Sequence, residues 1–536
     1  MALPSAAKHL GFLASRRGGV LQQQRLWIKM ASSYPAPAAA VPVEEVGNRG
    51  SSRSSHNTGR RNERETLIAI AATGLSAAFL SWQSCTGRRR SNSQVACCSS
   101  SSSSAVPSGG SEVYVWGANI DGQVGVGSGV SVSLPALLST LPLRPHETVS
   151  ALSGGARHSA CITSEGRVFL WGRGAEGEGG VPSAAEGPRE IVLPLQEGDK
   201  PILVSCGSDF SLVVTRMGCL YTWGRNTHGQ CGRPSSEGPA EQRGGARGSS
   251  APFPLEGIGS RDVFGGRGRS VSSLPPGQVG GQLSGRKVVG ASCGDRVCAA
   301  VTAEGEVFVW GEARAGGPLG GRSEGGAAAP HGPRLVPLPA EGGAPACAVA
   351  VACGESHCVA LSASGRVYAW GSNAYGQLGL GGGARTVEGP HLVTALRDHK
   401  VTAIACGALH TLCLTEQGSV FVWGYGKDGQ CAEPSHLDVP LPLQVAVEGP
   451  SGGPLVGPCT HISGGEGHSL AVCSGGRLFV WGRGREGQLG RGGLIESPAA
   501  SRDVPLEVLL PGGKRVVTAA CGGCHTIAAT CAPARA

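Results

Sequence analysis

The chain of 536 residues is longer than one ordinary compact domain, and it is rich in glycine, with 89 glycines but only 4% aromatic residues. This composition suits many short strands joined by turns and argues against long helices with bulky cores. The net charge of +8 is unevenly placed, because residues 1–105 carry 13 of the 46 basic residues and 4 of the 38 acidic residues. The remainder is nearly neutral, which argues against a large nucleic-acid-binding face on it.

The first 45 residues have the composition of an organelle transit peptide. Met1 to Val43 includes no acidic residue, and its five basic residues are interspersed with Leu, Ala and Ser. Acid-free, Arg-bearing starts are typical of mitochondrial and chloroplast targeting segments, and no apolar run of signal-peptide length follows the first basic residues. We therefore expect a mitochondrial protein, with a plastid as the alternative location. A basic tail without a targeting role is the other interpretation.

Residues 46–110 form a basic and Ser-rich linker around one apolar segment, residues 66–84. Leu67 to Trp82 contains no charged residue, and Arg88 to Arg90 follow it. The stretch is close to the lower length limit of a membrane-spanning helix, and basic residues on both sides leave its orientation open. A single membrane anchor, a cleaved targeting element and a helix packed on the following domain are the three interpretations.

A Trp-Gly pair recurs seven times from residue 111 onward and marks the repeat. The tryptophans are Trp116, Trp171, Trp223, Trp310, Trp370, Trp423 and Trp481. Six of them follow, always by 13 residues, a position that is usually His and that is preceded by a small residue, Gly and two variable residues. The histidines are His158, His357, His410, His468 and, after the last Trp-Gly pair, His525, while Phe210 and Val297 replace two others. So constant an interval indicates one fixed supersecondary unit.

The residues around this interval predict a four-stranded blade. Apolar runs on both sides of a Gly-containing turn, as in 469–472 and 478–481, predict a hairpin. A third strand is expected before the Cys-Gly pair (400–406 or 515–521), and a fourth after the Trp-Gly turn (334–338). Four strands at a period of 52 to 60 residues make a propeller blade. The interval from Trp223 to Trp310 is longer, 87 residues, and we assign residues 234–276 to an insertion.

The number of half-repeats predicts how the ring closes. Trp116 has no His half before it, and His525 has no Trp half after it. Joining the strands at Glu112 to Trp116 and Pro135 to Leu138 with those at Arg515 to Ala529 gives seven complete units and leaves no free end. We therefore expect an all-β, seven-bladed propeller over residues 111–536, closed by the N- and C-terminal strands and preceded by a largely disordered arm.

The repeat resembles that of the regulator of chromosome condensation family over about four fifths of the chain. The shared elements are C-G-x-x-H-[S/T], then G-x-[V/L]-[F/Y]-x-W-G, then G-Q-L-G, which is complete at Tyr375 to Gly379 and at Glu486 to Gly490. The family includes a UV-B photoreceptor with Trp in G-W-R-H-T elements. This chain has Arg157, Ser356, Leu409, Gly467 and Cys524 before its histidines, so we expect no photoreception.

We predict structural rather than catalytic or metal-binding roles for the repeated histidines, cysteines and glycines. Equivalent histidines of different blades are spread around a ring, so we expect each to make a blade-stabilising hydrogen bond and none to bind a metal or catalyse a reaction. The same argument makes Cys206, Cys293, Cys353, Cys406 and Cys521 small buried residues that do not pair. The Cys521-x-x-Cys524 pair lacks a second pair for zinc. Glycine clusters lack G-x-x-x-x-G-K-[S/T], so no cofactor is expected, and no catalytic residue can be assigned.

Three functions remain open after this reading. The first is a non-enzymatic protein-interaction scaffold in an organelle, acting in ribosome, RNA or inner-membrane processes, as the resemblance implies. The second is a guanine-nucleotide exchange factor for a small GTPase, the family's founding activity, which leaves no local catalytic motif. The third is a nuclear chromatin binder, which the basic arm fits but the apolar segment and neutral repeats do not. Nucleic acid would be reached only indirectly in the first two.

Overall fold

The computed structural model describes residues 111–127, 129, 131–173, 187–234, 273–312, 332–446, 457–492 and 501–530. All of them belong to one compact unit, Gly59–Ala536. The expected transit peptide, the apolar segment Leu67 to Trp82 and most of the 234–276 insertion lie outside the described residues. None of the helices formed by described residues is long and apolar enough to cross a membrane.

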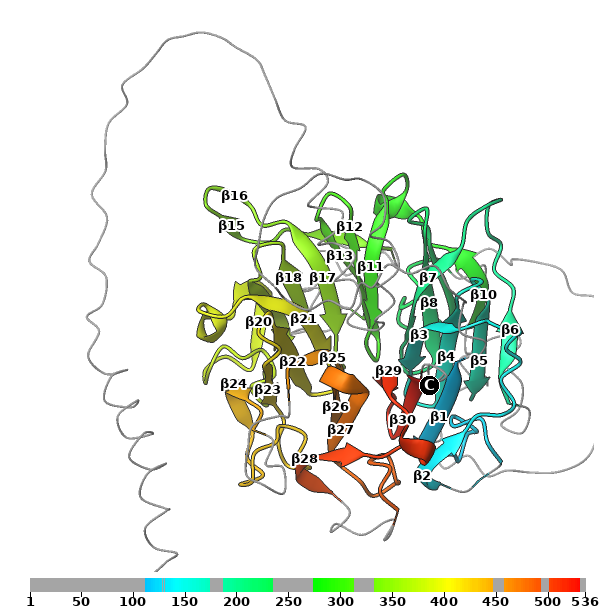
Figure 1. The fold of residues 1–536 in the computed structure, drawn as a ribbon. Coiled ribbons are helices and arrows are strands. Elements are labelled where there is room, and N and C mark those ends of the chain that lie inside the picture. The colour runs from blue at the N-terminus through cyan, green and yellow to red at the C-terminus, as the bar shows by residue number, and fades with distance from the viewer. Residues whose placement is uncertain are drawn as a thin grey trace, which may run out of the picture. The chain divides into compact units, whose positions relative to one another are not determined.

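Seven four-stranded antiparallel sheets follow one another in chain order around a common axis (Figure 1). We number them blades 1 to 7, starting with β3–β6. Each inner strand contacts the inner strands of both neighbouring blades. The inner strands are β3 (Val149–Gly154), β7 (Pro201–Cys206), β11 (Val288–Cys293), β17 (Ala348–Cys353), β21 (Val401–Cys406), β25 (Cys459–Gly464) and β29 (Val516–Cys521). The all-β, seven-bladed propeller expected from the repeat count is confirmed.

The second and third strands of each blade form the predicted hairpin. The second strands begin at the His position and are β4 (His158–Thr163), β8 (Phe210–Thr215), β12 (Val297–Thr302), β18 (His357–Ser362), β22 (His410–Thr415), β26 (His468–Cys473) and β30 (His525–Thr530). The third strands carry the Trp-Gly pair and are β5 (Val168–Gly172), β9 (Leu220–Arg225), β13 (Val307–Gly311), β19 (Val367–Ser372), β23 (Val420–Gly424), β27 (Arg477–Gly482) and β1 (Glu112–Gly117). In every blade the His position and the Gly of Trp-Gly are paired across the hairpin, which explains their constant interval.

The outer strands are the free edges of the sheets. They are β6 (Arg189–Ile191), β10 (Ser273–Gln278), β14 (Arg334–Val336), β20 (Thr386–Leu392), β24 (Val439–Gln444), β28 (Arg502–Val508) and β2 (Val132–Leu137). Five of the seven contain proline, and the two that do not, β6 and β14, are three residues long. Proline and short length both discourage a second chain from pairing with an edge.

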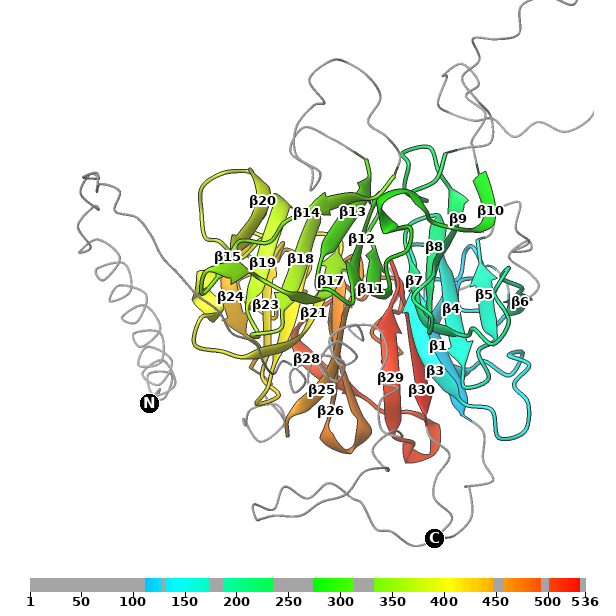
Figure 2. The ribbon, with the colours of Figure 1, turned by 90° about the horizontal axis from the view of Figure 1, so that it is seen from above.

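Short elements connect the blades. A two-stranded hairpin, β15 (Ala340–Glu341) with β16 (Ala344–Pro345), lies between blades 3 and 4. The single-turn 3-10 helices η1 (Gly281–Leu283), η2 (Thr394–Leu396) and η5 (Pro511–Gly513) also lie between blades, whereas η3 (Ser474–Gly476) lies in the hairpin between β26 and β27 of blade 6. Figure 2 shows from a second direction that these connections leave the blade order unchanged.

Blade 7 closes the ring from both ends of the propeller. Its strand order is β2-β1-β30-β29, so N-terminal strands complete a sheet begun by the last two strands of the chain. Apolar clusters then join it to both neighbours: Trp116 packs with Val480 of blade 6, and Val115 packs with Leu152 of blade 1. Closure removes the free ends that an open ring would expose, as the sequence predicted.

Every inner strand contains a β-bulge that the sequence did not predict. Its pairing with the second strand shifts at its second residue in all seven blades. The bulged residues are Ser150, Ile202, Val289, Val349, Thr402, Thr460 and Val517. Three have a hydroxyl, which donates to a carbonyl of the second strand at 3.0 to 3.3 Å. The bulges bend the inner strands where they begin.

Candidate protein-interaction face

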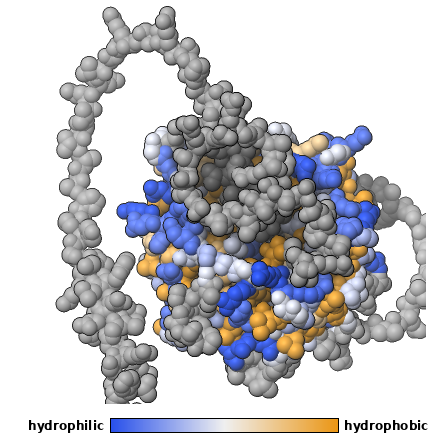
Figure 3. Space-filling view, in the orientation of Figure 1, coloured by the Kyte–Doolittle hydropathy of each residue, from blue (hydrophilic) through white to orange (hydrophobic). Residues whose placement is uncertain are grey.

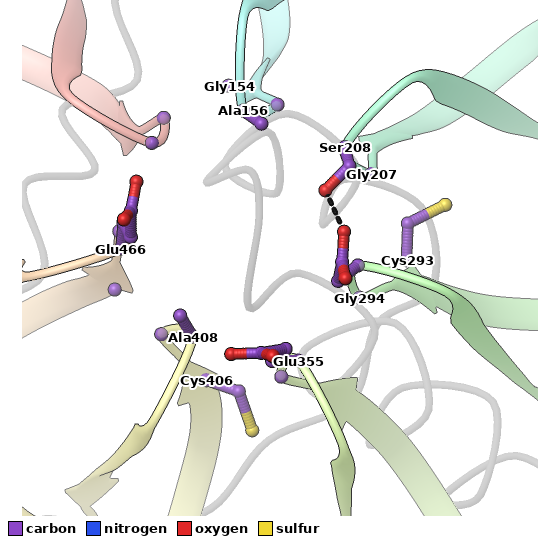
Figure 4. A pocket seen from close by; sticks show the side chains of 18 of the residues that line it. Gly154, Ala156, Gly207, Ser208, Cys293, Gly294, Glu355, Cys406, Ala408 and Glu466 are labelled. Carbon is purple, nitrogen blue, oxygen red and sulfur yellow. Dashed lines mark hydrogen bonds between the residues drawn. The ribbon is translucent and has the colours of Figure 1, made fainter. Parts of the chain in front are cut away.

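One end of the ring carries a cavity on the propeller axis. All inner strands end here, and their loops, five Cys-Gly-x and two Gly-Gly-x, line a cavity of about 290 Å³. The third strands end on the same side with Trp-Gly. We call this end of the ring the cavity face and the opposite end, where the inner strands begin, the exit face. Figure 4 shows loops of different blades around the opening, with the thiols of Cys293 and Cys406 pointing away from it.

The first variable position of these loops gives the cavity its charge. Three of the seven residues there are acidic, namely Asp295, Glu355 and Glu466, and no Lys or Arg among the described residues lines the cavity. The Ser208 hydroxyl donates to the Asp295 carboxylate (Figure 4), which also lies 3.3 Å from Nε of Arg296. Glu355 and Glu466 are exposed on the rim.

Arginine–carboxylate pairs surround this acidic centre. Arg225 lies 3.2 Å from Asp209, Arg296 lies 3.2 Å from Glu312, and Arg483 is paired with Glu486. Each pair is partly exposed, so each contributes little to stability. The pairs occupy the positions where the blades differ from one another, and they give each blade its own charge pattern on this face.

The five repeat histidines lie below the loops and join neighbouring blades. In each case Nε2 is 2.8 to 3.0 Å from the hydroxyl that follows the His position of the next blade. The pairs are His158 with Ser211, His357 with Thr411, His410 with Ser469, His468 with Thr526 and His525 with Ser159. The last pair crosses the closure between blades 7 and 1.

The hydroxyl defines the tautomer of four of these histidines. Ser159, Thr411, Ser469 and Thr526 each donate to the main-chain carbonyl of a glutamine in a G-Q turn, at 2.7 to 3.1 Å. A hydroxyl has one proton to donate, so it accepts from His Nε2–H. The Nδ1 atoms of His357, His410, His468 and His525 are then unprotonated, and they have no hydrogen-bond partner in the part of the chain that the structure describes.

Burial keeps these rings neutral. The pKa values of His158, His357 and His468 are lowered to about 4, and those of His410 and His525 to about 3, mainly by desolvation. Each ring also packs on the Gly of its own Cys-Gly pair: a Cβ on Gly354 would lie 2.1 Å from Cε1 of His357. The glycine before the two variable residues is therefore required by close packing.

Two blades lack the histidine, and the partner is replaced as well. Phe210 faces Cys298 where other blades have His and a hydroxyl, and Val297 faces Cys358. The loop-to-loop backbone hydrogen bonds that join blades 4, 5, 6, 7 and 1 also have no counterpart between the described residues of blades 2 and 3 or 3 and 4. Among the described residues, both boundaries of blade 3 therefore lack the histidine–hydroxyl pair and the backbone bond between loops.

The tryptophans use the same glutamine carbonyls. Nε1 of Trp116, Trp310, Trp423 and Trp481 donates to the carbonyl of Gln488, Gln230, Gln377 and Gln430, respectively, at 2.8 to 2.9 Å. Trp171 Nε1 has no partner among the described residues. Trp223 and Trp370 are buried as well, and the turns that precede them in the ring, within 174–186 and 313–331, are not described. In blades 5, 6 and 7 one glutamine carbonyl of the preceding G-Q turn thus accepts from both the tryptophan and the hydroxyl that follows the His position.

Sequence reasoning missed this role of the glutamine. Its side chain is also buried and accepts from a backbone N–H two residues earlier, as in Gln377 with Tyr375 at 2.9 Å. The recurrence of G-Q after Trp-Gly was the available signal. It could not identify the acceptor, because that atom is a main-chain carbonyl acting across a blade boundary.

The cysteines at the repeat position are separate thiols. Cys206, Cys293, Cys353, Cys406 and Cys521 are unpaired, as predicted. Cys459 and Cys473, which are opposite each other on β25 and β26, form a disulfide that the sequence did not predict. Within the described ranges, no three His, Cys, Asp or Glu side chains are grouped as metal ligands.

Comparisons with known proteins agree with this geometry. The family model of the RCC1-like domain matches residues 257–533. The regulator of chromosome condensation (RCC1) repeat matches residues 111–162, 165–214 and 217–265. These matches cover the propeller from its first strand to its last.

Three curated relatives are similar along most of their length. The Arabidopsis thaliana ultraviolet-B receptor UVR8 is 29% identical over 388 residues, 72% of this chain and 76% of that protein. The Mus musculus secretion-regulating guanine nucleotide exchange factor is 30% identical over 455 residues, 80% of this chain and 85% of that protein. The mitochondrial RCC1 domain-containing protein RUG3 of Arabidopsis thaliana is 27% identical over 408 residues, 72% and 80%.

A solved structure has the same fold. The Saccharomyces cerevisiae protein Prp20p, described with its binding to Gsp1p and histones, aligns with a TM-score of 0.62 over 80% of this chain and 92% of its own, at 20% identity. With the repeats, the closed ring and the matched ranges together, the chain belongs to the regulator of chromosome condensation (RCC1) family.

Proposed function

We propose that this chain is a non-enzymatic protein-interaction scaffold that acts in an organelle and binds its partner on the cavity face. The observation that supports the proposal is the division of the repeat into fixed positions and variable positions. The fixed His, Trp and Gln positions are buried and occupied with holding the ring together. The variable positions of the C-G-x-x-H loops and Trp-Gly turns gather on one face, where they are free to recognise a partner.

The chemistry of the cavity face favours a partner with basic side chains. Exposed Glu355 and Glu466 flank the opening. Tyr375 and Tyr425 make an edge-to-face contact at 5.1 Å in the turns of blades 4 and 5, and they are partly exposed. Carboxylates with neighbouring aromatic rings suit Lys or Arg side chains.

Two observations support an organelle as the location. The acid-free start from Met1 to Val43 suits a transit peptide, and the relative RUG3, 27% identical, is named as mitochondrial. A fluorescent protein fused to residues 1–110 is expected to enter mitochondria, with plastids as the alternative. Accumulation of the fusion in the nucleus would contradict this location. Carbonate extraction of the full-length chain from membranes then tests Leu67 to Trp82 as an anchor.

A guanine-nucleotide exchange factor for a small GTPase is the second candidate. It is favoured by 30% identity to a named exchange factor over 80% of this chain. Exchange needs no bond-making residue in the propeller, only a rigid surface that distorts the nucleotide site of the partner. The full-length chain would then speed the release of labelled GDP from its GTPase, and Glu355→Arg with Glu466→Arg would abolish the effect. If the chain accelerates GDP release from no GTPase of a test panel, the exchange-factor hypothesis is wrong and the scaffold proposal remains.

A further inference from the structure

The exit face is where the N-terminal arm joins the propeller. The third strand of blade 7, β1, begins there at Glu112, and the Ser111 hydroxyl accepts a hydrogen bond from the backbone N–H of Val149 at 3.2 Å. The 110 residues before Ser111 include the uncharged stretch from Leu67 to Trp82 and the basic triplet Arg88 to Arg90.

Cationic residues recur on this face at one position of the blade. The residue before the inner strand is Lys200, Lys287, Lys400 or Arg515 in four of the seven blades, and all four are exposed. In each, side-chain atoms pack on the turn glycine of the preceding blade, as Cγ of Lys287 does, lying 2.5 Å from where a Cβ on Gly218 would be. The side-chain stems are held, so the charged ends surround the axis at fixed places.

Large apolar side chains are exposed beside these cations. The bulged residues Ile202 and Val517, two positions after Lys200 and Arg515, are 45% and 39% exposed. Met217, next to the glycine on which Lys287 packs, is 50% exposed. These six residues, which we call the exit patch, belong to blades 7, 2 and 3 and lie on either side of the point where the arm enters.

The exit patch has a surplus of positive charge. Lys200, Lys287 and Arg515 form no ion pair with a carboxylate in the described part of the chain, whereas Lys400 is paired with Glu416 at 2.7 Å. Three neighbouring carboxylates have other cation partners: Glu112 pairs with Lys514, Glu147 with Arg167 and Glu306 with Arg286. The buried Asp199 carboxylate has no cation partner among the described residues; it accepts from the backbone N–H groups of Lys200 and Met217 and offsets part of the surplus. Exposed Arg216 adds to the surplus, and exposed Glu197 and Glu304 oppose it in part.

We infer that the exit patch docks on an anionic lipid surface. Lipid headgroups attract the three cations, and the acyl boundary accepts Ile202, Met217 and Val517 between them. The alternation of cations with apolar side chains suits the boundary between headgroups and acyl chains. On the face that Figure 3 displays, the visible hydrophobic and hydrophilic residues are interspersed.

The experiment measures binding of the full-length chain to phosphatidylcholine vesicles with and without phosphatidylserine. We expect binding to require the anionic lipid and to weaken with salt. The K200Q/K287Q/R515Q variant should bind about 100-fold more weakly, since each Lys or Arg near such a surface contributes about fivefold. The matched control neutralises three exposed cations of the cavity face, R385Q/K427Q/R485Q, and should bind like the unsubstituted chain.

Two further measurements distinguish lipid binding by the exit patch from lipid binding by the N-terminal arm. I202S/M217S/V517S should weaken binding without changing its dependence on anionic lipid. Vesicles should protect the amides of 199–202, 215–219 and 515–517 from hydrogen exchange, but not those of the C-G-x-x-H loops. Equal binding of K200Q/K287Q/R515Q and the control, absence of that protection, or tighter binding to single-stranded RNA than to anionic vesicles would overturn the inference.

Discussion

The histidine, the hydroxyl of the next blade and the glutamine carbonyl behind it form one relay at four blade boundaries. Because the hydroxyl donates onward, removing the histidine leaves a buried oxygen with one partner fewer. A buried hydrogen bond of this kind is worth about 1 kcal/mol, and a broken one costs about 1–3 kcal/mol. The side chains that mark the repeat therefore act in stability, and their loss in blades 2 and 3 weakens the ring locally.

His410→Phe, which copies the natural residue at position 210, should lower the free energy of unfolding by about 1–3 kcal/mol. Urea denaturation of His410→Phe, Ser469→Ala and the double variant measures the coupling between the two side chains. We expect the double variant to be less destabilised than the sum of the single variants. Strict additivity would show that the 2.8 Å contact of His410 with Ser469 adds nothing.

The buried histidines also predict how stability depends on pH. Their folded pKa values of about 3 to 4 lie below the 6.5 of an exposed histidine, because burial disfavours the charged ring. Below pH 6.5 the unfolded chain binds protons that the folded chain does not. Stability should therefore fall from pH 6.5 to about 4, by up to about 1.4 kcal/mol per pH unit for each histidine.

Denaturation at a series of pH values between 7.5 and 5 tests this, since most carboxylates still keep their charge there. The variant H357F/H468F should show a smaller decrease per pH unit than the unsubstituted chain. An unchanged slope would mean that other groups cause the dependence.

At the scale of one element, the G-Q turn has a packing role that the sequence did not indicate. Its last glycine has positive φ and lies against the tryptophan of the next blade, as Gly379 does, with φ of +69° and a Cβ position 2.8 Å from Nε1 of Trp423. Any side chain there meets both a strained backbone and a packed ring. The turn therefore ends in Gly in four of the five described copies, and Ala432 stands at this position in the fifth with φ of 52°.

Gly379→Ala should destabilise the propeller by about 2–4 kcal/mol, because it combines left-handed strain with a clash against Trp423. Gly382→Ala, three residues on in the same connection, is the matched control. No atom lies within 4 Å of its Cβ position, and its φ is not in the left-handed region. Thermal unfolding of both variants distinguishes them, and equal losses would refute the packing argument.

The reverse experiment is possible in blade 2, because the missing histidine–hydroxyl hydrogen bond to blade 3 can be introduced by substitution. Phe210→His with Cys298→Ser places an Nε2 donor opposite a hydroxyl, and that hydroxyl can donate to the carbonyl of Gln230, which already accepts from Trp310 and Cys298. The pair should be favourable by about 1 kcal/mol relative to the sum of the single substitutions. Slower hydrogen exchange of β8 and β12 in the double variant is the second readout. A coupling of zero would mean that the blade 2–3 boundary is packed differently.

At the scale of the whole molecule, the sequence predicted the ring and its closure from counting alone. The C-G-x-x-H and Trp-Gly elements bear fixed side chains at fixed spacing, so they identify the strands and their partners. The bulges at Ile202 and Val517, the shared glutamine carbonyls and the Cys459–Cys473 disulfide could not be predicted. They depend on backbone atoms and on which residues the folded ring brings opposite each other.

The two faces of the ring differ because the repeat is divided into fixed and variable positions. Cavity-face loops vary from blade to blade and place Glu355 and Glu466 around the axis. The exit face repeats cations at one position and receives the arm. If the exit patch docks on a membrane as we infer, the cavity face points away from that membrane, which suits a scaffold.

The most direct test of the account is affinity capture of the full-length chain from isolated organelles in detergent, compared between two charge variants. We predict that E355R/E466R, on the cavity face, loses the specific partner by about tenfold or more because like charges then oppose its basic side chains. K200E/R515E, on the exit face, should retain that partner. Retention by E355R/E466R together with loss by K200E/R515E would contradict the assignment of the cavity face as the binding surface.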